Sequence, residues 1–265
     1  MSTRQERAEE VLRAYSPKLF RLFARYLDRY FASNFNSVRV LAPGLPALAA
    51  DRPVVFFCNH AGWWDPILYL LVAARLVSDR RGFGPIDAQA LQKYRFLRRI
   101  GLFPVEQDSR RGAIDFLVAA KVILAVPGTS LWLTPQGQFC DARERPVRFK
   151  AGLAHLVRDM PAVQLVPFAA EYPFWSERRP EALVHFGPVI DGTSFDGQGV
   201  EVVQSRLEQA LTEALDRLAQ AAIARDETAF QPLVVGKAGV SPVYDAWRWM
   251  KAKIAGRDFS SAHKD

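Results

Sequence analysis

Short apolar runs alternate with stretches of helical periodicity along the middle of the chain. The apolar runs, which are typical of strands covered on both faces, lie at 53–59, 102–106, 130–134, 163–171 and, less distinctly, 182–190. The helical stretches lie at 65–77, 88–100, 112–125, 150–158 and 200–225. Asp65 and Pro66 supply an N-cap and a first-turn proline for the first of these helices. This alternation predicts an α/β fold, with a mainly parallel sheet flanked by helices and active groups at the carboxyl ends of the strands.

Both ends of the chain combine basic residues with apolar residues at helical spacing. After Ser16, large apolar residues recur every three or four positions and define one helix face: Leu19, Phe20, Phe23, Tyr26, Leu27, Tyr30 and Phe31. A basic stripe is expected elsewhere on that helix from Lys18, Arg21, Arg25 and Arg29. After Ser241 and Pro242, aromatic and apolar residues again alternate with basic ones: Tyr244, Trp247, Arg248, Trp249, Met250, Lys251, Lys253 and Ile254. Either segment alone fits a helix packed on the domain as well as one at a membrane surface, and two such ends favour the membrane.

Composition and charge narrow the class of protein. The chain has 265 residues, 49% of them hydrophobic, which is enough for a folded core. Its two cysteines exclude a disulfide scaffold and leave no Cys and His cluster, so we expect a reducing compartment and no metal site. The net charge of +7 comes mostly from the two ends. Because these ends also carry large apolar residues, we expect their binding partner to be a lipid surface rather than a nucleic acid. The N-terminus lacks a signal-peptide core, and no run approaches the ~20 apolar residues that span a bilayer.

A histidine and an aspartate follow the first predicted strand. His60 and Asp65 are five positions apart, which is about 140° around a continuous helix, so contact between them requires the turn that Gly62 permits. A carboxylate bonded to an imidazole fixes its tautomer and stabilises its protonated form, which suits the histidine to act as a general base. Taken alone, the pair fits a structural interpretation at least as well as a catalytic one. In the structural interpretation Asp65 only caps its helix, and His60 is an ordinary loop histidine.

Further motifs follow this pair in one order along the chain. Asn59, His60 and Asp65 precede Gly101-Leu102-Phe103-Pro104-Val105, Pro135-Gln136-Gly137, Phe149-Lys150-Ala151-Gly152 and Val166-Pro167-Phe168. This order resembles the glycerolipid acyltransferase family over roughly residues 50–170, with the His-x4-Asp motif as the most specific part. The resemblance implies an α/β domain that transfers an acyl group from acyl-CoA or acyl carrier protein to a lipid hydroxyl, with His60 as the general base and Asp65 as its partner. It also implies N-terminal helices that hold the enzyme on the bilayer.

Two motifs depart from the family pattern. Gln107 stands where the second motif normally has an arginine associated with the acceptor phosphate, and the third motif, normally Phe-Pro-Glu-Gly-Thr-Arg, is Thr-Pro-Gln-Gly-Gln-Phe at 134–139. An amide cannot replace the paired donors of a guanidinium group but suits hydroxyls and amides, so we expect an acceptor without a simple phosphate monoester. Arg110, Arg111 and Lys150 remain able to compensate. The residues expected to bind substrate are Gln107, Arg110, Arg111, Gln136, Gly137 and Lys150.

These observations predict a peripheral O-acyltransferase on the cytoplasmic face of a membrane. We divide the chain into amphipathic membrane-associating helices (1–35), an acyltransferase domain (36–228) and a basic, Trp-rich tail (229–265). The expected partners are the membrane surface, the lipid acceptor and a thioester co-substrate, acyl-CoA or acyl carrier protein, with no further cofactor and no nucleic acid. The alternatives are a conventional 1-acylglycerol-3-phosphate acyltransferase of phospholipid synthesis and a catalytically silent lipid-binding relative.

Other residues carry less weight. Cys58 lies within an apolar run and is expected to be a small buried hydrophobe rather than a thiolate nucleophile. Gly82 and Gly84 lack the third glycine of a dinucleotide-binding loop. A basic cluster fits either a phosphate of CoA or lipid, or a solvated loop: Arg143, Arg145, Arg148 and Lys150.

Overall fold

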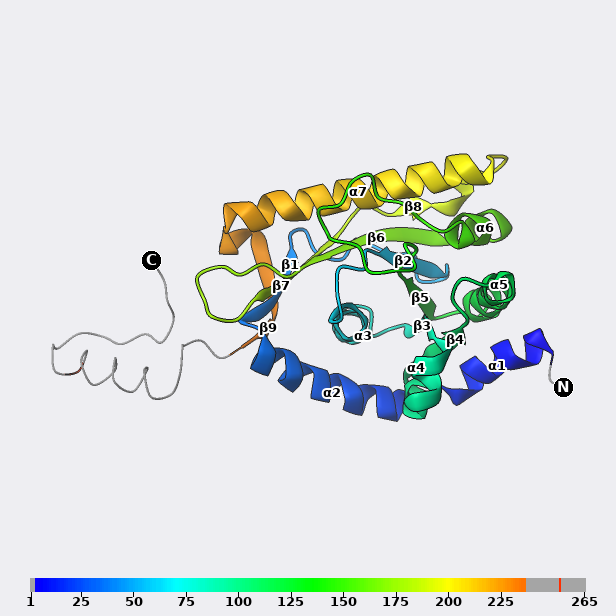
Figure 1. Cartoon of the computed structure of the whole chain (residues 1–265), viewed down its shortest axis with the longest axis horizontal. Helices are drawn as coiled ribbons and strands as arrows, with labels where there is room; N and C mark the ends of the chain where they lie inside the picture. Colours follow the sequence, from blue (N-terminus) through cyan, green and yellow to red (C-terminus); the bar gives the residue numbers. More distant parts are fainter. Residues whose placement is uncertain (1–2, 237–252, 254–265) are drawn as a thin grey trace.

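The structure, a computed structural model, describes residues 3–236 and residue 253. Within these residues nine strands form one sheet in the order β4-β3-β5-β2-β6-β7-β1-β9, with β8 paired to β6, and helices cover both faces (Figure 1). The helix expected after Ser241 and Pro242 lies outside the described residues.

The elements alternate as the apolar pattern predicts. The strands are β1 (Ser37–Leu41), β2 (Val54–Cys58), β3 (Arg81–Asp87), β4 (Leu102–Val105), β5 (Thr129–Leu133), β6 (Gln164–Glu171), β7 (Glu181–Phe186), β8 (Ile190–Asp191) and β9 (Phe230–Val235). The α-helices are α1 (Arg4–Ala14), α2 (Pro17–Asn34), α3 (Asp65–Leu76), α4 (Ala88–Lys93), α5 (Arg110–Leu124), α6 (Gly152–Asp159) and α7 (Val200–Ala224). The 3₁₀ turns are η1 (Arg95–Ile100), η2 (Gly192–Phe195) and η3 (Glu227–Ala229).

Most neighbouring strands are parallel. Strand β2 lies between β5 and β6 and is parallel to both, while β3 is parallel to β4 and β5. The antiparallel pairs are β6 with β7, β6 with β8, and β1 with β9. The prediction of an α/β fold with a mainly parallel sheet is therefore confirmed.

Strand β2 shows why the sheet is covered on both faces. Its five residues are all buried, and their side chains alternate between two hydrophobic cores because successive residues of a strand point to opposite faces. Val55 and Phe57 pack with residues of α5, α6 and α7, whereas Val54 and Phe56 pack with residues of α2 and α3. The continuous apolar run of the sequence is the consequence of this double burial.

Three strands were not expected from the sequence. Strand β3 contains two glycines and a proline, β9 contains Pro232, and β1 pairs only with strands that follow it by more than 140 residues. Their strand state depends on partners in the sheet rather than on local propensity. Strand β9 also begins within the segment that we assigned to the C-terminal tail, so the sheet extends beyond residue 228.

The single helix expected at 88–100 is wrong. Asp87 caps a short α4, the helix ends at Lys93 with Tyr94 as its C-cap, and a 3₁₀ turn continues to Ile100. Gly101 then adopts a left-handed conformation with φ of 100°, and a Cβ atom there would lie 2.2 Å from the carbonyl oxygen of Gly82. This close approach turns the chain so that β4 pairs with β3.

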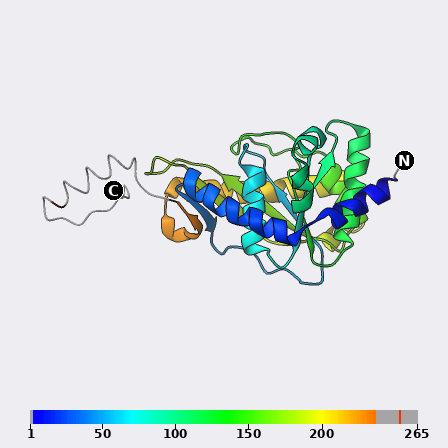
Figure 2. The same ribbon diagram turned by 90° about the horizontal axis from the view of Figure 1, so that it is seen from below.

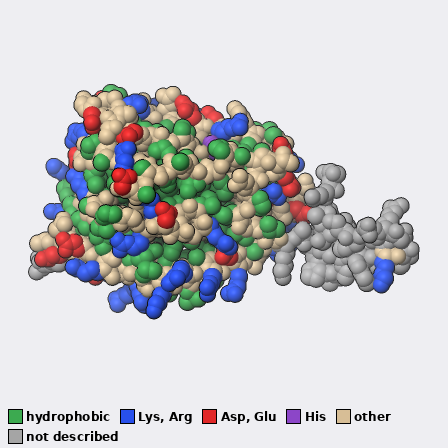
Figure 3. Space-filling model, turned by 180° about the vertical axis from the view of Figure 1, so that it is seen from behind, with side chains coloured by type: hydrophobic (Ala, Val, Ile, Leu, Met, Phe, Trp, Pro, Cys, Tyr) green, Lys and Arg blue, Asp and Glu red, His purple; other side chains and the backbone are tan. Residues whose placement is uncertain are grey.

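Helix α2 has two different sides. Phe20, Leu27 and Phe31 are buried in the core beneath the sheet, so the main apolar face packs on the domain. Leu22 and Tyr26 are 62% and 52% exposed. Helices α1 and α2 follow one another along one side of the molecule (Figure 2), and basic side chains gather along the edge where α2 lies (Figure 3).

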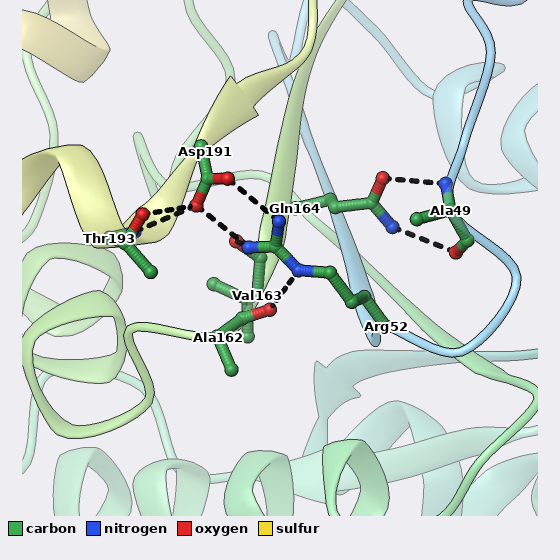
Figure 4. A network of polar contacts seen from close by, with 7 residues as sticks. All are labelled: Ala49, Arg52, Ala162, Val163, Gln164, Asp191 and Thr193. Atoms are coloured by element: carbon green, nitrogen blue, oxygen red, sulfur yellow. Dashed lines mark hydrogen bonds and ion pairs between the residues drawn. The ribbon is translucent and has the colours of Figure 1, made fainter.

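A polar network anchors the connection between β1 and β2 (Figure 4). The guanidinium group of Arg52 donates two hydrogen bonds of 2.7 Å to the Asp191 carboxylate and one of 2.8 Å to the carbonyl oxygen of Ala162. The buried Gln164 amide accepts from the Ala49 backbone N–H and donates to the Ala49 carbonyl oxygen, at 2.8 and 3.0 Å. The network fixes the start of β2 against β6 and β8.

Gln164→Ala is expected to lower the free energy of unfolding by about 1–3 kcal/mol, because the part-buried Ala49 N–H loses its partner, while the Ala49 carbonyl oxygen still accepts from Arg80. Urea denaturation followed by circular dichroism measures the change. Gln209→Ala removes an exposed glutamine of α7 and is expected to change it by less than about 0.5 kcal/mol. Equal effects of the two substitutions would contradict an anchoring role for Gln164.

Candidate active site

His60 and Asp65 are in contact at the carboxyl end of β2. The Nδ1 atom of His60 lies 2.8 Å from Oδ2 of Asp65. The Asp65 side chain is fully buried, whereas that of His60 is 18% exposed. Because an ionised carboxylate can only accept, the proton of the neutral imidazole resides on Nδ1, and Nε2 is left as the basic nitrogen.

The Asp65 carboxylate is turned back toward the loop that precedes it. Oδ2 also accepts the backbone N–H of Gly62 at 2.8 Å, and Oδ1 accepts the hydroxyl of Tyr172 at 2.6 Å. The N-cap expected at Asp65 is therefore wrong: Trp64 is the N-cap, without a side-chain bond, and Asp65 is the first helical residue. Its side chain contacts His60 because the chain turns between Gly62 and Asp65, where the Asp65 N–H donates to the Gly62 carbonyl oxygen at 3.2 Å.

The neighbours of Asp65 are protonated groups. Burial, and after it the negative charge of Asp65, raises the pKa of Cys58 and the pKa of Tyr69 well above their ordinary values. The same two causes, followed by the hydrogen bond to Asp65, raise the pKa of Tyr172. Cys58 is thus a buried thiol, in agreement with the interpretation that it is not a nucleophile.

Backbone contacts hold the His60 loop. The Asn59 side chain bridges to Ala170 of β6, donating to its carbonyl oxygen at 3.0 Å and accepting its N–H at 2.8 Å. The His60 N–H donates to Oε1 of Gln136 at 3.0 Å, and the His60 carbonyl oxygen accepts the Cys140 N–H at 2.8 Å. Gln136, expected to bind substrate, thus uses its carbonyl oxygen to fix the backbone of His60.

His60 lines an apolar cavity of about 610 Å³ between α3 and the strands β3 and β5. Its wall includes large side chains and two glycines of β3: Tyr69, Leu70, Phe83, Trp132, Gly82 and Gly84. The exposed Phe139 ring covers the imidazole, with ring centroids 4.3 Å apart. A second cavity of about 520 Å³ shares Asp87, Gln107 and Lys150 with the first.

The residues expected to bind substrate are only partly brought together. Gln107, Gly137 and Lys150 line both cavities, and Arg110 lines the second. Gly137 has a φ of 69°, and a Cβ atom there would lie 2.7 Å from Cε of Lys150, so a larger residue would displace the lysine. Arg111 instead contacts Asp115, one turn along α5, and is 71% exposed.

The basic cluster around Lys150 forms ion pairs with four different carboxylates. Lys150 contacts Asp108 at 2.6 Å, beside Arg143 with Asp141 at 2.7 Å. The remaining pairs join the cluster to α7, and they are Arg145 with Asp216 and Arg148 with Glu208. Free basic groups for a phosphate are therefore fewer than the sequence suggests.

Several residues of the site were missed in the sequence. Tyr69 lies four positions after Asp65, so helical spacing places it on the side of α3 that faces His60. Tyr172 follows the last residue of β6, and the rule that active groups lie at carboxyl ends of strands applies to it. For Trp132 and Phe83, the sequence indicates only burial. Among the described residues, no group of His, Cys, Asp and Glu is arranged to hold a metal ion.

The geometry suits proton transfer beside a bound apolar chain. Nε2 of His60 can take a proton from a hydroxyl group, and Asp65 stabilises the resulting imidazolium in a site where water is largely excluded. The cavity places the apolar part of a substrate next to this base. Fold and site together describe an α/β protein with a His–Asp pair beside an apolar cavity, an arrangement suited to an enzyme that acts on a substrate with an apolar chain.

Comparison with known proteins agrees with this class. A family model described as Acyltransferase matches residues 39–171, half of the chain, and no curated protein matches the chain at a significant level. The chain therefore belongs to this glycerolipid acyltransferase family and is a lipid acyltransferase. The matched segment contains His60, Asp65 and all residues expected to bind substrate.

His60→Ala is expected to reduce acyl transfer at least ~10²-fold, because general-base assistance contributes about that much or more. Asp65→Asn should also lose activity yet keep the fold, since its amide can accept from His60 and Gly62 and donate to the Tyr172 oxygen without stabilising the imidazolium. Thiol release from acyl-CoA and thermal unfolding measure the two properties. Retention of more than about a tenth of wild-type activity by His60→Ala would contradict the base, and unfolding of Asp65→Asn would indicate a structural role.

Proposed function

We propose that the protein transfers an acyl chain from a thioester, acyl-CoA or acyl carrier protein, to the hydroxyl of a membrane lipid without a phosphate monoester. The observation that carries the reaction is the contact of Asp65 with His60, which lines the apolar cavity. His60 takes the hydroxyl proton as the oxygen attacks the thioester carbonyl. The tetrahedral intermediate then collapses, the carbon–sulfur bond breaks, and the imidazolium returns its proton to the leaving thiolate.

The charges around the two cavities support a phosphate-free acceptor. Lys150 and Arg110 are their basic residues besides His60, and Asp87, Glu106 and Asp108 are their acidic ones. Lys150 already pairs with Asp108. To bind Lys150, a phosphate monoester would have to displace the Asp108 carboxylate, and Asp87 and Glu106 would repel it. A sugar or amide group can form hydrogen bonds with amides such as Gln107 without that repulsion.

A surface of exposed apolar and basic side chains supports membrane association. It consists of Leu22, Tyr26, Trp63, Tyr94 and Phe96, together with Lys18, Arg21, Arg25, Arg29 and Arg95. Ring contacts link Phe96 through Phe23 to Tyr26, and Tyr26 through Tyr30 to Trp64, next to Trp63.

This composition suits the headgroup layer of an anionic bilayer. The surface lies beside the site, because Trp63 is in the His60 loop and the next residues begin α3, which lines the cavity. In the described part of the chain, no helix has the length and apolar character needed to cross a bilayer.

Reversal of charge at Arg21, Arg25 and Arg29 to glutamate is expected to lower the partition coefficient on anionic vesicles by at least ~100-fold, at roughly 1 kcal/mol per basic residue near the surface. Vesicle sedimentation measures it. The matched control changes Arg206, Arg217 and Arg225 to glutamate, at or next to α7 on the opposite side of the sheet (Figure 1). Equal binding of the α2 variant and the wild type, with an intact fold, would contradict the membrane role of α2.

Transfer to lysophosphatidic acid is expected to be at least ~10-fold slower than transfer to phosphate-free hydroxylated lipids, because a charge-assisted bond to the missing arginine is worth roughly 1.5–3 kcal/mol. Rates are compared at equal surface concentration with one acyl donor. Efficient use of lysophosphatidic acid that is lost in Arg110→Ala or Lys150→Ala would support the conventional enzyme instead. If no acceptor leads to thiol release, the protein is instead a catalytically silent lipid-binding relative.

A further inference from the structure

We propose that Tyr172 is a positioning residue for the reaction, whose hydroxyl holds the second carboxylate oxygen of Asp65 and thereby sets the orientation and the basicity of His60. The inference rests on the proposed role of His60 as the base. Tyr172 lies one residue beyond the segment that the family model matches, so the family motifs do not assign it a role.

The two oxygens of Asp65 are held separately. Oδ2 accepts from His60 and Gly62, both within the loop between β2 and α3, whereas Oδ1 accepts from Tyr172 at the end of β6. Contacts at both oxygens prevent rotation of the carboxylate, which keeps Oδ2 on Nδ1 of His60. Since Asp65 is fully buried, loss of the Tyr172 hydroxyl would leave Oδ1 without water to replace it.

Tyr172 is suited to this task because its ring is fixed and its proton is retained. The ring packs against the fully buried Phe35, with centroids 5.9 Å apart, and Phe35 in turn contacts Trp64 next to Asp65. Because burial and the nearby carboxylate raise its pKa, the phenol remains a donor throughout the pH range of the reaction.

The direction of the effect on His60 follows from charge. A donor on Oδ1 withdraws negative charge from the carboxylate and weakens its attraction for the imidazolium. Cys58 and Tyr69, the other titratable groups next to Asp65, remain neutral and do not change in this range. The charged residues that line the cavity with His60 are Asp87, Asp108 and Lys150, and the substitution leaves all three in place. Removing the Tyr172 hydroxyl therefore favours the protonated form of His60, so that its titration midpoint rises while its orientation becomes less fixed.

The test is Tyr172→Phe in the full chain, with Tyr15→Phe as the matched control. Tyr15 is a half-buried tyrosine packed on Phe20 and Phe83, away from Asp65. The His60 ring signal is assigned among the four histidines by its loss in His60→Ala, and its titration midpoint is followed by NMR beside the pH profile of kcat/KM. Tyr172→Phe is expected to raise the midpoint and the acid limb by about 0.5–1 pH unit and to lower kcat about 3–10-fold, with KM changed less than about twofold. Tyr15→Phe is expected to leave the midpoint unchanged.

An unchanged midpoint and acid limb in Tyr172→Phe, with or without a lower melting temperature, would overturn the proposal. If Tyr172→Phe does not fold, a fluorinated tyrosine at position 172 provides the second measurement. Being a stronger donor, it should shift the midpoint downward, and the absence of that shift would also overturn the proposal. Full activity of His60→Ala would instead contradict the base, and the NMR midpoints would still report whether Tyr172 controls the imidazole.

Discussion

A buried carboxylate is the constraint around which this site is organised. Asp65 has no exposure to water, so its charge must be balanced by donors from the protein. Those donors come from three places: the His60 ring, the Gly62 backbone and the Tyr172 hydroxyl. Each requires a particular element, namely the end of β2, the start of α3 and the end of β6. The adjacency of β2 and β6 in the sheet is therefore a requirement of the dyad as well as of the core.

The sequence predicts well those elements whose environment is uniform. Strands β2, β5 and β6 are buried along most of their length, and such burial leaves apolar runs that need no partner to be recognised. Strand β3, with the sequence RGFGPID, has no such signal, because Gly84 permits a close approach to the backbone of Trp132 and glycine does not favour a strand. The His–Asp pair could be predicted because its partners are only five positions apart, one in the loop after β2 and the other at the start of α3. Tyr172 could not, since it lies 107 residues after Asp65 and only the pairing of β2 with β6 brings them together.

Helix α2 shows how one amphipathic pattern can serve two surfaces. Its periodic apolar residues, which alone fit either a core or a membrane, are mostly used for packing beneath the sheet. The side chains left exposed are fewer, and they join with Trp63 and the η1 segment into one mixed apolar and basic surface. Spacing alone could not separate these two sets, because Tyr26 belongs to the predicted apolar face together with the buried Leu27 and is nevertheless 52% exposed.

The position of β1 in the sheet also has a consequence for the order of events during synthesis. Ser37 pairs with Glu181 on one side and Val235 on the other, so β1 has no partner until most of the chain has left the ribosome. At ~5–20 residues per second, Glu181 follows Ser37 by roughly 7–30 s. During that interval Phe31 and Phe35 lack the residues of β6 and β7 that complete their hydrophobic core. The nascent chain therefore presents a basic amphipathic helix with its apolar face uncovered well before the enzyme exists as a folded domain.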